Sequence, residues 1–200
     1  MQVFLETDRL ALRQFTEADL DNLVDLDSDP DVMRFINGGT PTSRDVIQNE
    51  ILPRFLHCYE QYDGYGRWAA IEKSTGDFLG WFHFRPLQGA SPDEPELGYR
   101  LRKAAWGKGY GTEGSRALIR KGFTELGVRR VFATTYQDNL GSRRVMEKAG
   151  MTLVRTFRIT TEEMVAHGYH VTPKDLWDGD DVEYALEKAD WERQESESAA

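Results

Sequence analysis

Cysteine is nearly absent from this chain of 200 residues, and long apolar runs are missing. Its one cysteine, Cys58, cannot form an intramolecular disulfide, which is usual for proteins of a reducing cytoplasm. No apolar run near the first residue suggests a signal peptide, and no stretch approaches the roughly 18 apolar residues that a membrane span needs. We therefore expect a cytoplasmic protein without a membrane partner.

Metal-ligand motifs and Walker motifs are absent too. The 4 histidines are scattered without the spacing of a metal site, so we expect no metal. Acidic residues outnumber basic ones by 34 to 25, and the net charge of −9 disfavours nucleic acid as a partner. At this length the chain is most simply one domain with a full hydrophobic core.

A glycine-rich stretch, residues 96–114 (ELGYRLRKAAWGKGYGTEG), dominates the middle of the chain. Its first six residues alternate as in a strand, four glycines follow, and helical spacing of apolar residues begins after Thr112. The first N–H groups of a helix have no partner inside the helix and favour an anion. Residues 107–112 therefore predict a phosphate or pyrophosphate site.

The distribution of charge supports an anionic ligand. Residues 100–148 contain 12 Lys or Arg and 4 Asp or Glu, a net of +8 within a chain of net −9. A single basic segment in an acidic protein suits a polyanionic small molecule better than it suits nucleic acid.

Residues 109–114 also match the G-x-G-x-x-G fingerprint of dinucleotide-binding folds. That fold needs an apolar first strand and an acidic residue about 20 positions later. Here the strand carries Glu96, Arg100 and Arg102, and the nearest suitable acid, Asp138, comes too late. A nicotinamide-dependent oxidoreductase is kept only as an alternative hypothesis.

Three motifs, in order along the chain, resemble one known family. Residues 106–113 (WGKGYGTE) resemble the acetyl-CoA pyrophosphate loop of the GNAT acyltransferase superfamily, Q/R-x-x-G-x-G/A, with Trp in the first place. Residues 138–151 (DNLGSRRVMEKAGM) resemble the segment D-N-x-x-S-x-R-V-x-E-K-x-G-F/M of its RimJ/RimL-type branch. Residues 7–13 (TDRLALR) resemble the first strand of that branch, whose members acetylate the N-termini of ribosomal proteins.

The resemblance and the strand patterns together predict an α/β, single-domain GNAT-like fold over residues 1–191. Its mixed, mostly antiparallel central sheet would have about seven strands flanked by helices, at residues 10–15, 67–72, 78–85, 96–101, 128–136, 152–159 and 182–187. The family implies a splay between the fourth and fifth of these strands. Residues 160–176 are expected to be an insertion, and residues 192–200 a disordered tail.

Helix boundaries show local signals. Residues 16–19 resemble a capping box that opens a helix. A later helical pattern runs towards residue 62, and Pro53 within it should kink or split the helix. Residues 139–150 predict a short helix that ends at Gly150.

The resemblance implies acetyl-CoA as co-substrate, with its pantetheine arm in the splay. The implied cofactor-binding residues are Leu101, Arg102, Trp106, Gly107, Lys108, Gly109, Tyr110, Gly111, Thr112, Asn139, Ser142 and Arg144. Asn139 and Ser142 could equally serve as ordinary helix caps. Arg144, like Lys148, could meet the 3′-phosphate or could be plain surface charge.

Acetyl transfer to an amine needs a group that takes the amine proton, because only the neutral amine attacks. The resemblance suggests Glu96 as this base, directly or through water; otherwise Glu96 faces solvent or pairs with an Arg. Many relatives have a Tyr seven residues after the Asn as acid for the departing thiolate. Here Met146 takes that place, so Ser142 is the replacement acid, or the thiolate leaves unprotonated.

The sequence thus predicts an acetyl-CoA-dependent N-acetyltransferase that acts by direct attack in a ternary complex. The acceptor would be a primary amine, either a protein N-terminus or a small molecule, in a pocket that Phe35, Phe55 and Tyr59 could line. A homodimer is possible. The alternative is a non-catalytic acyl-CoA-binding or sensor module, which would keep the loop and Asn139 but lack a productive base.

Overall fold

One open sheet runs through the computed structural model, which describes residues 2–61, 63–87, 89–158, 160 and 179–198. Its strands are β1 (Val3–Glu6), β2 (Leu10–Gln14), β3 (Gly66–Glu72), β4 (Phe78–Arg85), β5 (Glu96–Leu101), β6 (Arg130–Tyr136), β7 (Thr152–Phe157) and β8 (Asp181–Glu187). Their spatial order is β1-β2-β3-β4-β5-β6-β8-β7, and β5–β6 is the parallel pair in an otherwise antiparallel sheet. The predicted mixed, mostly antiparallel sheet is confirmed, with β1 as a strand that the pattern analysis missed.

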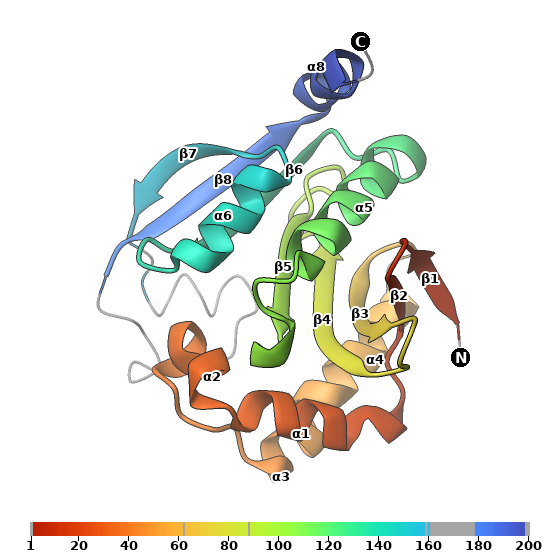
Figure 1. Cartoon of the computed structure of the whole chain (residues 1–200), viewed down its shortest axis with the longest axis vertical. Helices are drawn as coiled ribbons and strands as arrows, with labels where there is room; N and C mark the ends of the chain where they lie inside the picture. Colours follow the sequence, from red (N-terminus) through yellow and green to blue (C-terminus); the bar gives the residue numbers. More distant parts are fainter. Residues whose placement is uncertain (1, 62, 88, 159, 161–178, 199–200) are drawn as a thin grey trace.

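Helices cover both faces of the sheet (Figure 1). They are α1 (Leu20–Ser28), α2 (Pro30–Asn37), α3 (Arg44–Val46), α4 (Leu52–Gln61), α5 (Tyr110–Glu125), α6 (Leu140–Lys148) and α8 (Lys188–Ser198). Figure 1 shows α5 and α6 together over one face, and α1–α4 gathered as a separate group.

Alternation along β4 explains why the sheet has a core on each face. Phe82 and Phe84 point to α5 and belong to the larger core. Trp81 points the other way and packs edge-on against Phe55 of α4, with ring centroids 5.8 Å apart. Successive residues of β4 point to opposite faces of the sheet. Each core therefore packs against the helices on its own side.

Local chemistry explains most helix boundaries. The Thr16 N–H donates to the Asp19 carboxylate at 2.9 Å, which completes the predicted capping box before α1. The helical pattern that contains Pro53 is divided into α3 and α4, as predicted. A π-helical turn, Ile47–Ile51, leads into α4, and its wider hydrogen-bond spacing suits a residue that has no N–H to donate.

The end of the chain differs from the prediction. Residues 192–198 are helical within α8 and not a disordered tail. Tertiary contacts explain the difference, since Trp191 packs against Phe123 at 5.4 Å and Glu195 pairs with Arg120 of α5. The insertion predicted at residues 160–176 lies outside the described residues, apart from Thr160.

Strands β5 and β6 meet at one end and then diverge. Their parallel register contains the single pair Glu96–Phe132, and the Phe132 N–H donates to the Pro95 carbonyl at 3.2 Å. Beyond this pair the strands separate, while β4–β5 and β6–β8 stay paired along their lengths. The predicted splay between these two strands is confirmed.

Gly114 allows α5 to pack closely on β4, which yields a first testable prediction. A Cβ atom at this position would overlap the fully buried ring of Phe82. We expect Gly114→Ala to lower the free energy of unfolding by about 1–3 kcal/mol despite the better helix propensity of Ala. Urea denaturation would measure this effect.

Gly141→Ala is the matched control, because Gly141 is helical in α6 and its added Cβ would meet only the Asn139 Oδ1 at 3.8 Å. Its stability should stay the same or rise by less than about 1 kcal/mol. Equal stability of both variants would contradict the packing argument.

Candidate active site

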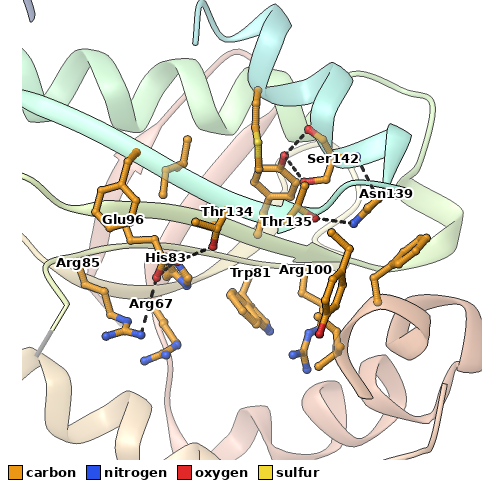
Figure 2. Close-up of a pocket in the computed structure, with 18 of the residues that line it drawn as sticks. Arg67, Trp81, His83, Arg85, Glu96, Arg100, Thr134, Thr135, Asn139 and Ser142 are labelled. Carbon is orange, nitrogen blue, oxygen red and sulfur yellow. Dashed lines mark hydrogen bonds and ion pairs between the residues drawn. The ribbon is translucent and has the colours of Figure 1, made fainter. Parts of the chain in front are cut away.

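A cavity of about 470 Å³ lies where β5 and β6 diverge. Its lining comes from both layers: Trp81, His83 and Glu96 from one face of the sheet, and Tyr99, Asn139 and Ser142 from the other. Figure 2 shows the two sets of side chains on either side of the strand ribbons. The cavity therefore connects the two sides of the sheet through the splay.

Strand register places a row of polar residues on the face that α1–α4 cover. Directly opposite residues share a face, and the cross-strand partners here are Arg67 with His83, Arg85 with Glu96, and Trp81 with Arg100. Glu96 is only 4% exposed. This predicted base thus lies at the cavity and not in open solvent.

Polar groups of the described residues lie close to both oxygens of Glu96. Its Oε2 lies 3.3 Å from His83 Nε2 and 4.0 Å from an Arg85 Nη2, and its Oε1 accepts from the Thr134 hydroxyl at 3.4 Å. Burial lowers the pKa of His83 to about 4, although the Glu96 carboxylate acts in the opposite direction. At neutral pH the imidazole is therefore uncharged, and one of its tautomers can donate to Glu96.

Gly98 makes this arrangement possible. It faces His83 across the β4–β5 pair, and a Cβ atom at Gly98 would lie 2.5 Å from the imidazole Cε1. Any larger residue would displace the ring. The glycine in the middle of β5 thus lets the imidazole lie flat over the strand, within reach of Glu96.

A second cluster lies on the other face, at the start of α6. The Tyr99 hydroxyl donates to the Ser142 carbonyl at 3.0 Å and lies 3.0 Å from the Ser142 hydroxyl. Burial raises the pKa of Tyr99, so it stays protonated. Asn139 caps the helix, since its side-chain oxygen accepts from the Ser142 N–H at 3.2 Å and its amide donates to Thr135.

The glycine loop leads into the start of α5 as expected. Gly107 and Gly109 have φ of 71° and 86°, which glycine adopts readily, and no atom lies within 4 Å of a Cβ built on Gly107. Arg9 ties the loop down by donating to the Lys108 carbonyl at 3.0 Å and pairing with Glu113. Open space over a helix N-terminus suits a phosphate group.

Three further residues of the loop motif lie in the first turn of α5. Tyr110 is buried and donates to the Glu72 carboxylate, which joins the helix to β3. Gly111 lies against Val145 of α6, where a Cβ would come within 3.2 Å. Thr112 lies in the first turn of the helix. Tyr110 thus has a packing role in addition to the expected binding role.

Strand alternation separates the two predicted pantetheine-pairing residues. The Arg102 N–H donates to the Leu79 carbonyl at 2.8 Å, and the Arg102 carbonyl accepts from the Ala105 N–H at 2.9 Å. Both backbone groups of Arg102 are engaged away from the splay, and its side chain lies 3.6 Å from Asp25. Leu101 faces the splay, with its carbonyl accepting from the Trp106 indole at 2.8 Å. The prediction of Arg102 as a pantetheine contact is therefore not supported by its position.

The remaining candidates lie at the outer rim. Arg144 is exposed on α6, one residue before the Val145 that lies against Gly111. Trp106 is 47% exposed, which leaves an aromatic surface beside the loop. Residues of this rim fit a phosphate-bearing ligand, and the polar groups of Tyr99 and Asn139 fit an amide-containing arm in the splay.

Sequence reasoning missed the residues around Glu96. His83, Arg85 and Arg67 drew no attention, although Trp81, His83 and Arg85 alternate along β4 and so had to share one face. The hydroxyl of Tyr99, which contacts Ser142, was not singled out from the sequence either. The expected pocket residues Phe35 and Phe55 do line the cavity, whereas Tyr59 donates to the Arg67 carbonyl and the Phe15 N–H donates to it.

The described residues contain neither a metal-ligand cluster nor a membrane-spanning helix. In that part of the chain, no three His, Cys, Asp or Glu residues cluster so as to hold a metal ion. Nor does any helix within the described ranges have the length and apolar content to cross a membrane.

Known proteins resemble this chain in sequence and in fold. Residues 9–152 match the family model described as an acetyltransferase (GNAT) domain. The chain is 30% identical to the FsC-acetyl coenzyme A-N(2)-transacetylase of Aspergillus fumigatus, over 98% of this chain and 81% of that protein.

Solved structures agree on the fold. A GNAT-family acetyltransferase from Bacillus anthracis superposes with a TM-score of 0.73 at 25% identity, covering 92% of this chain and 98% of that one. RimL, a ribosomal L7/L12 α-N-protein acetyltransferase in complex with coenzyme A, gives 0.73 at 17% identity, covering 93% and 98%. The resemblance inferred from the three motifs is confirmed.

The buried imidazole of His83 predicts a dependence of stability on pH. Its pKa is about 4 in the folded protein and about 6.5 in the unfolded chain, so the unfolded state takes up the proton first as pH falls. Stability should therefore rise between pH 4 and pH 6.5, with up to about 3 kcal/mol from this group. Urea denaturation across this window would show a smaller rise for His83→Gln than for the wild type.

His57→Gln is the control, because that imidazole is 62% exposed and does not line the cavity. Its stability should follow the wild-type pH dependence. Identical curves for all three proteins would show that the imidazole of His83 titrates normally in the folded state.

Proposed function

The chain belongs to the GNAT acetyltransferases and is an acetyl-CoA-dependent enzyme; from this premise we propose that it acetylates a primary amine by direct attack in a ternary complex. The observation that carries the proposal is the cavity at the splay, which joins Glu96 on one face of the sheet to Ser142 on the other. An amine can enter from the side of α1–α4, while acetyl-CoA, which supplies the acetyl group as a thioester, comes from the side of α5 and α6. The name of the Aspergillus relative, an N(2)-transacetylase, supports nitrogen as the acceptor atom.

Glu96 is the proposed base. Its carboxyl group is buried at the cavity, and its Oε2 lies 3.3 Å from the Nε2 of the neutral His83 ring. An ammonium group drawn to this carboxylate can lose a proton to it, directly or through one water. The nitrogen lone pair is then free to attack the thioester carbonyl as the bond to sulfur breaks.

Ser142 is the proposed acid for the departing sulfur. Ser142 lines the cavity, and its hydroxyl lies 3.0 Å from the Tyr99 hydroxyl, which also donates to the Ser142 carbonyl at 3.0 Å. The buried tyrosine keeps its own proton, so it orients Ser142 without becoming an anion. Met146 lines the same cavity, but its thioether has no proton to donate. Ser142 is therefore the proposed acid, with Tyr99 as the residue that positions it.

We propose that the remaining binding contacts come from the loop and the rim. The N–H groups from Gly107 to Thr112 would hold the pyrophosphate, Lys108 and Arg144 would add positive charge, and the outward-facing backbone of Tyr99 and Leu101 would pair with the pantetheine arm. A homodimer and the absence of metal and nucleic-acid partners stay predictions.

Glu96→Gln tests the base. The amide keeps the shape of the side chain but cannot take a proton, so kcat should fall by about 10²–10⁴-fold. The dissociation constant for acetyl-CoA, measured by calorimetric titration, should stay near the wild-type value, because Glu96 lies on the acceptor face. Unchanged turnover would exclude Glu96 as the base, and binding without any amine-dependent thiol release from the wild type would favour the sensor module.

Ser142→Ala tests the acid. The substitution removes the hydroxyl but keeps the backbone N–H that Asn139 caps, so α6 should stay intact. Loss of a positioned acid should lower kcat by about 10²-fold or more while acetyl-CoA binding persists. Tyr99→Phe should lower kcat in the same direction by a smaller factor, since Ser142 remains. Wild-type kcat in Ser142→Ala would mean that the thiolate leaves unprotonated.

A further inference from the structure

The imidazole of His83 is buried beside the proposed base, and its two ring nitrogens have different surroundings. Nε2 lies 3.3 Å from Oε2 of Glu96, whereas Nδ1 has no hydrogen-bond partner among the described residues. The contact to Glu96 is long and imperfectly aligned, which is common for catalytic hydrogen bonds that tighten when substrate binds. Figure 2 shows His83 and Glu96 together on the wall of the cavity.

The position of the imidazole proton follows from these surroundings. Burial lowers the pKa of His83 to about 4, so at neutral pH the ring carries a single proton. On Nδ1 that proton would be a buried donor with no acceptor among the described residues, which is unfavourable. On Nε2 it has a carboxyl oxygen 3.3 Å away. The structure therefore favours the tautomer that donates from Nε2 to Glu96.

Neighbouring residues hold the ring in one orientation. Gly98 lies directly opposite His83 in the β4–β5 pair, and its lack of a side chain leaves the space that Cε1 and Nε2 occupy. The Trp81 ring, two residues earlier on β4, is nearly parallel to the imidazole, with 5.9 Å between the ring centroids and 23° between the planes. A side chain that is locked by packing in this way can fix the orientation of a functional group that it contacts.

We propose that His83 is a positioning residue for acetyl transfer: its Nε2–H holds the Glu96 carboxyl group in the orientation from which that group takes the proton of the amine. The inference rests on the function proposed above and adds a residue to its mechanism. The proton passes from the amine nitrogen to Glu96, and the imidazole keeps its own proton throughout. The Thr134 hydroxyl, which donates to Oε1 at 3.4 Å, contacts the other oxygen of the same group.

Three substitutions of His83 test whether the Nε2–H is what matters. The side-chain nitrogen of Gln is as many bonds from the backbone as Nε2, so His83→Gln keeps a donor near Glu96. The nitrogen of Asn corresponds to Nδ1, so His83→Asn moves the donor away, and His83→Leu has none. The acceptor is the one that gives the wild type its fastest acetyl-CoA-dependent thiol release in a panel of primary amines and dipeptides. We expect kcat to fall by about 10–100-fold in the Asn and Leu variants and by less than about fivefold in the Gln variant. The dissociation constant for acetyl-CoA should stay at the wild-type value in all three.

The titration of Glu96 gives a readout that does not depend on turnover. A donor to a carboxylate favours the charged form, so the loss of the donor should raise the pH midpoint at which Glu96 titrates. The measurement is ¹³C NMR of the side-chain carboxyl groups, with the Glu96 signal assigned by its absence in Glu96→Gln. We expect a midpoint at least about 0.5 pH unit higher in His83→Leu than in the wild type, and a midpoint close to the wild type in His83→Gln.

Other charged side chains line the same cavity, and the comparison does not depend on how they are paired. Among the described residues, the sheet contributes Arg67, Arg85, Arg100, Arg155, Asp181 and Glu183, and the helices contribute Asp27 and Arg54. All of them are the same in the wild type and in the three variants. Their influence on the Glu96 titration is therefore common to every protein compared.

Gly98→Ala moves the ring without changing its chemistry. The added Cβ atom would lie 2.5 Å from Cε1 and 2.6 Å from Nε2, so the imidazole has to shift. We expect kcat to fall by about tenfold or more, as in His83→Leu, although the histidine is still present. His57→Gln is the control, since it removes an imidazole that does not line the cavity, and it should keep the wild-type kcat.

The outcomes separate this inference from the function on which it rests. Equal kcat in the wild type and His83→Leu, or an unchanged Glu96 midpoint in that variant, would overturn the inference and leave an amine acetyltransferase. His83→Gln as slow as His83→Leu would also overturn it, because the ring would then act through its shape and not through its N–H. Thiol release that no member of the panel stimulates in the wild type would contradict both the proposed function and the inference.

Discussion

The divergence of two parallel strands is the constraint on which the rest of the structure depends. Strands β5 and β6 share the single pair Glu96–Phe132 and then part, which leaves unpaired backbone and a cavity through the middle of the sheet. A continuous sheet would separate the layer of α1–α4 from the layer of α5 and α6. Because it is interrupted here, groups on opposite faces of β5, such as Glu96 and Tyr99, can act on one reaction.

The two faces of the sheet differ in the buried polar groups that they place at the cavity. On one face the buried carboxyl group of Glu96 lies 3.3 Å from an imidazole that burial keeps neutral and 4.0 Å from Arg85. On the other face the polar groups are hydroxyls and amides, and Tyr99 stays protonated. In the proposed mechanism, proton removal and ligand positioning are thus divided between the layers, and the amine and the thioester arrive from opposite sides.

Prediction from sequence succeeded where chemistry is local. The glycine loop, the Asn139 cap and the capping box at Thr16 depend on residues a few positions apart, so their patterns can be read directly. Prediction from sequence failed where the interacting residues are distant from one another in the sequence. Arg102 was assigned to the splay, but strand alternation turns its backbone toward β4, and the positions of His83 and Arg67 required the register of three strands.

The sequence by itself determined the strand–glycine turn–helix unit, the family and Glu96 as the candidate base, because each of these follows from short motifs and backbone freedom at glycine. Only the tertiary structure decided what surrounds that base. The register between β3, β4 and β5 brings Arg67, His83 and Arg85 beside Glu96, and Gly98 leaves the space that the imidazole occupies. Cross-strand register depends on the packing of the whole sheet, which no local pattern specifies.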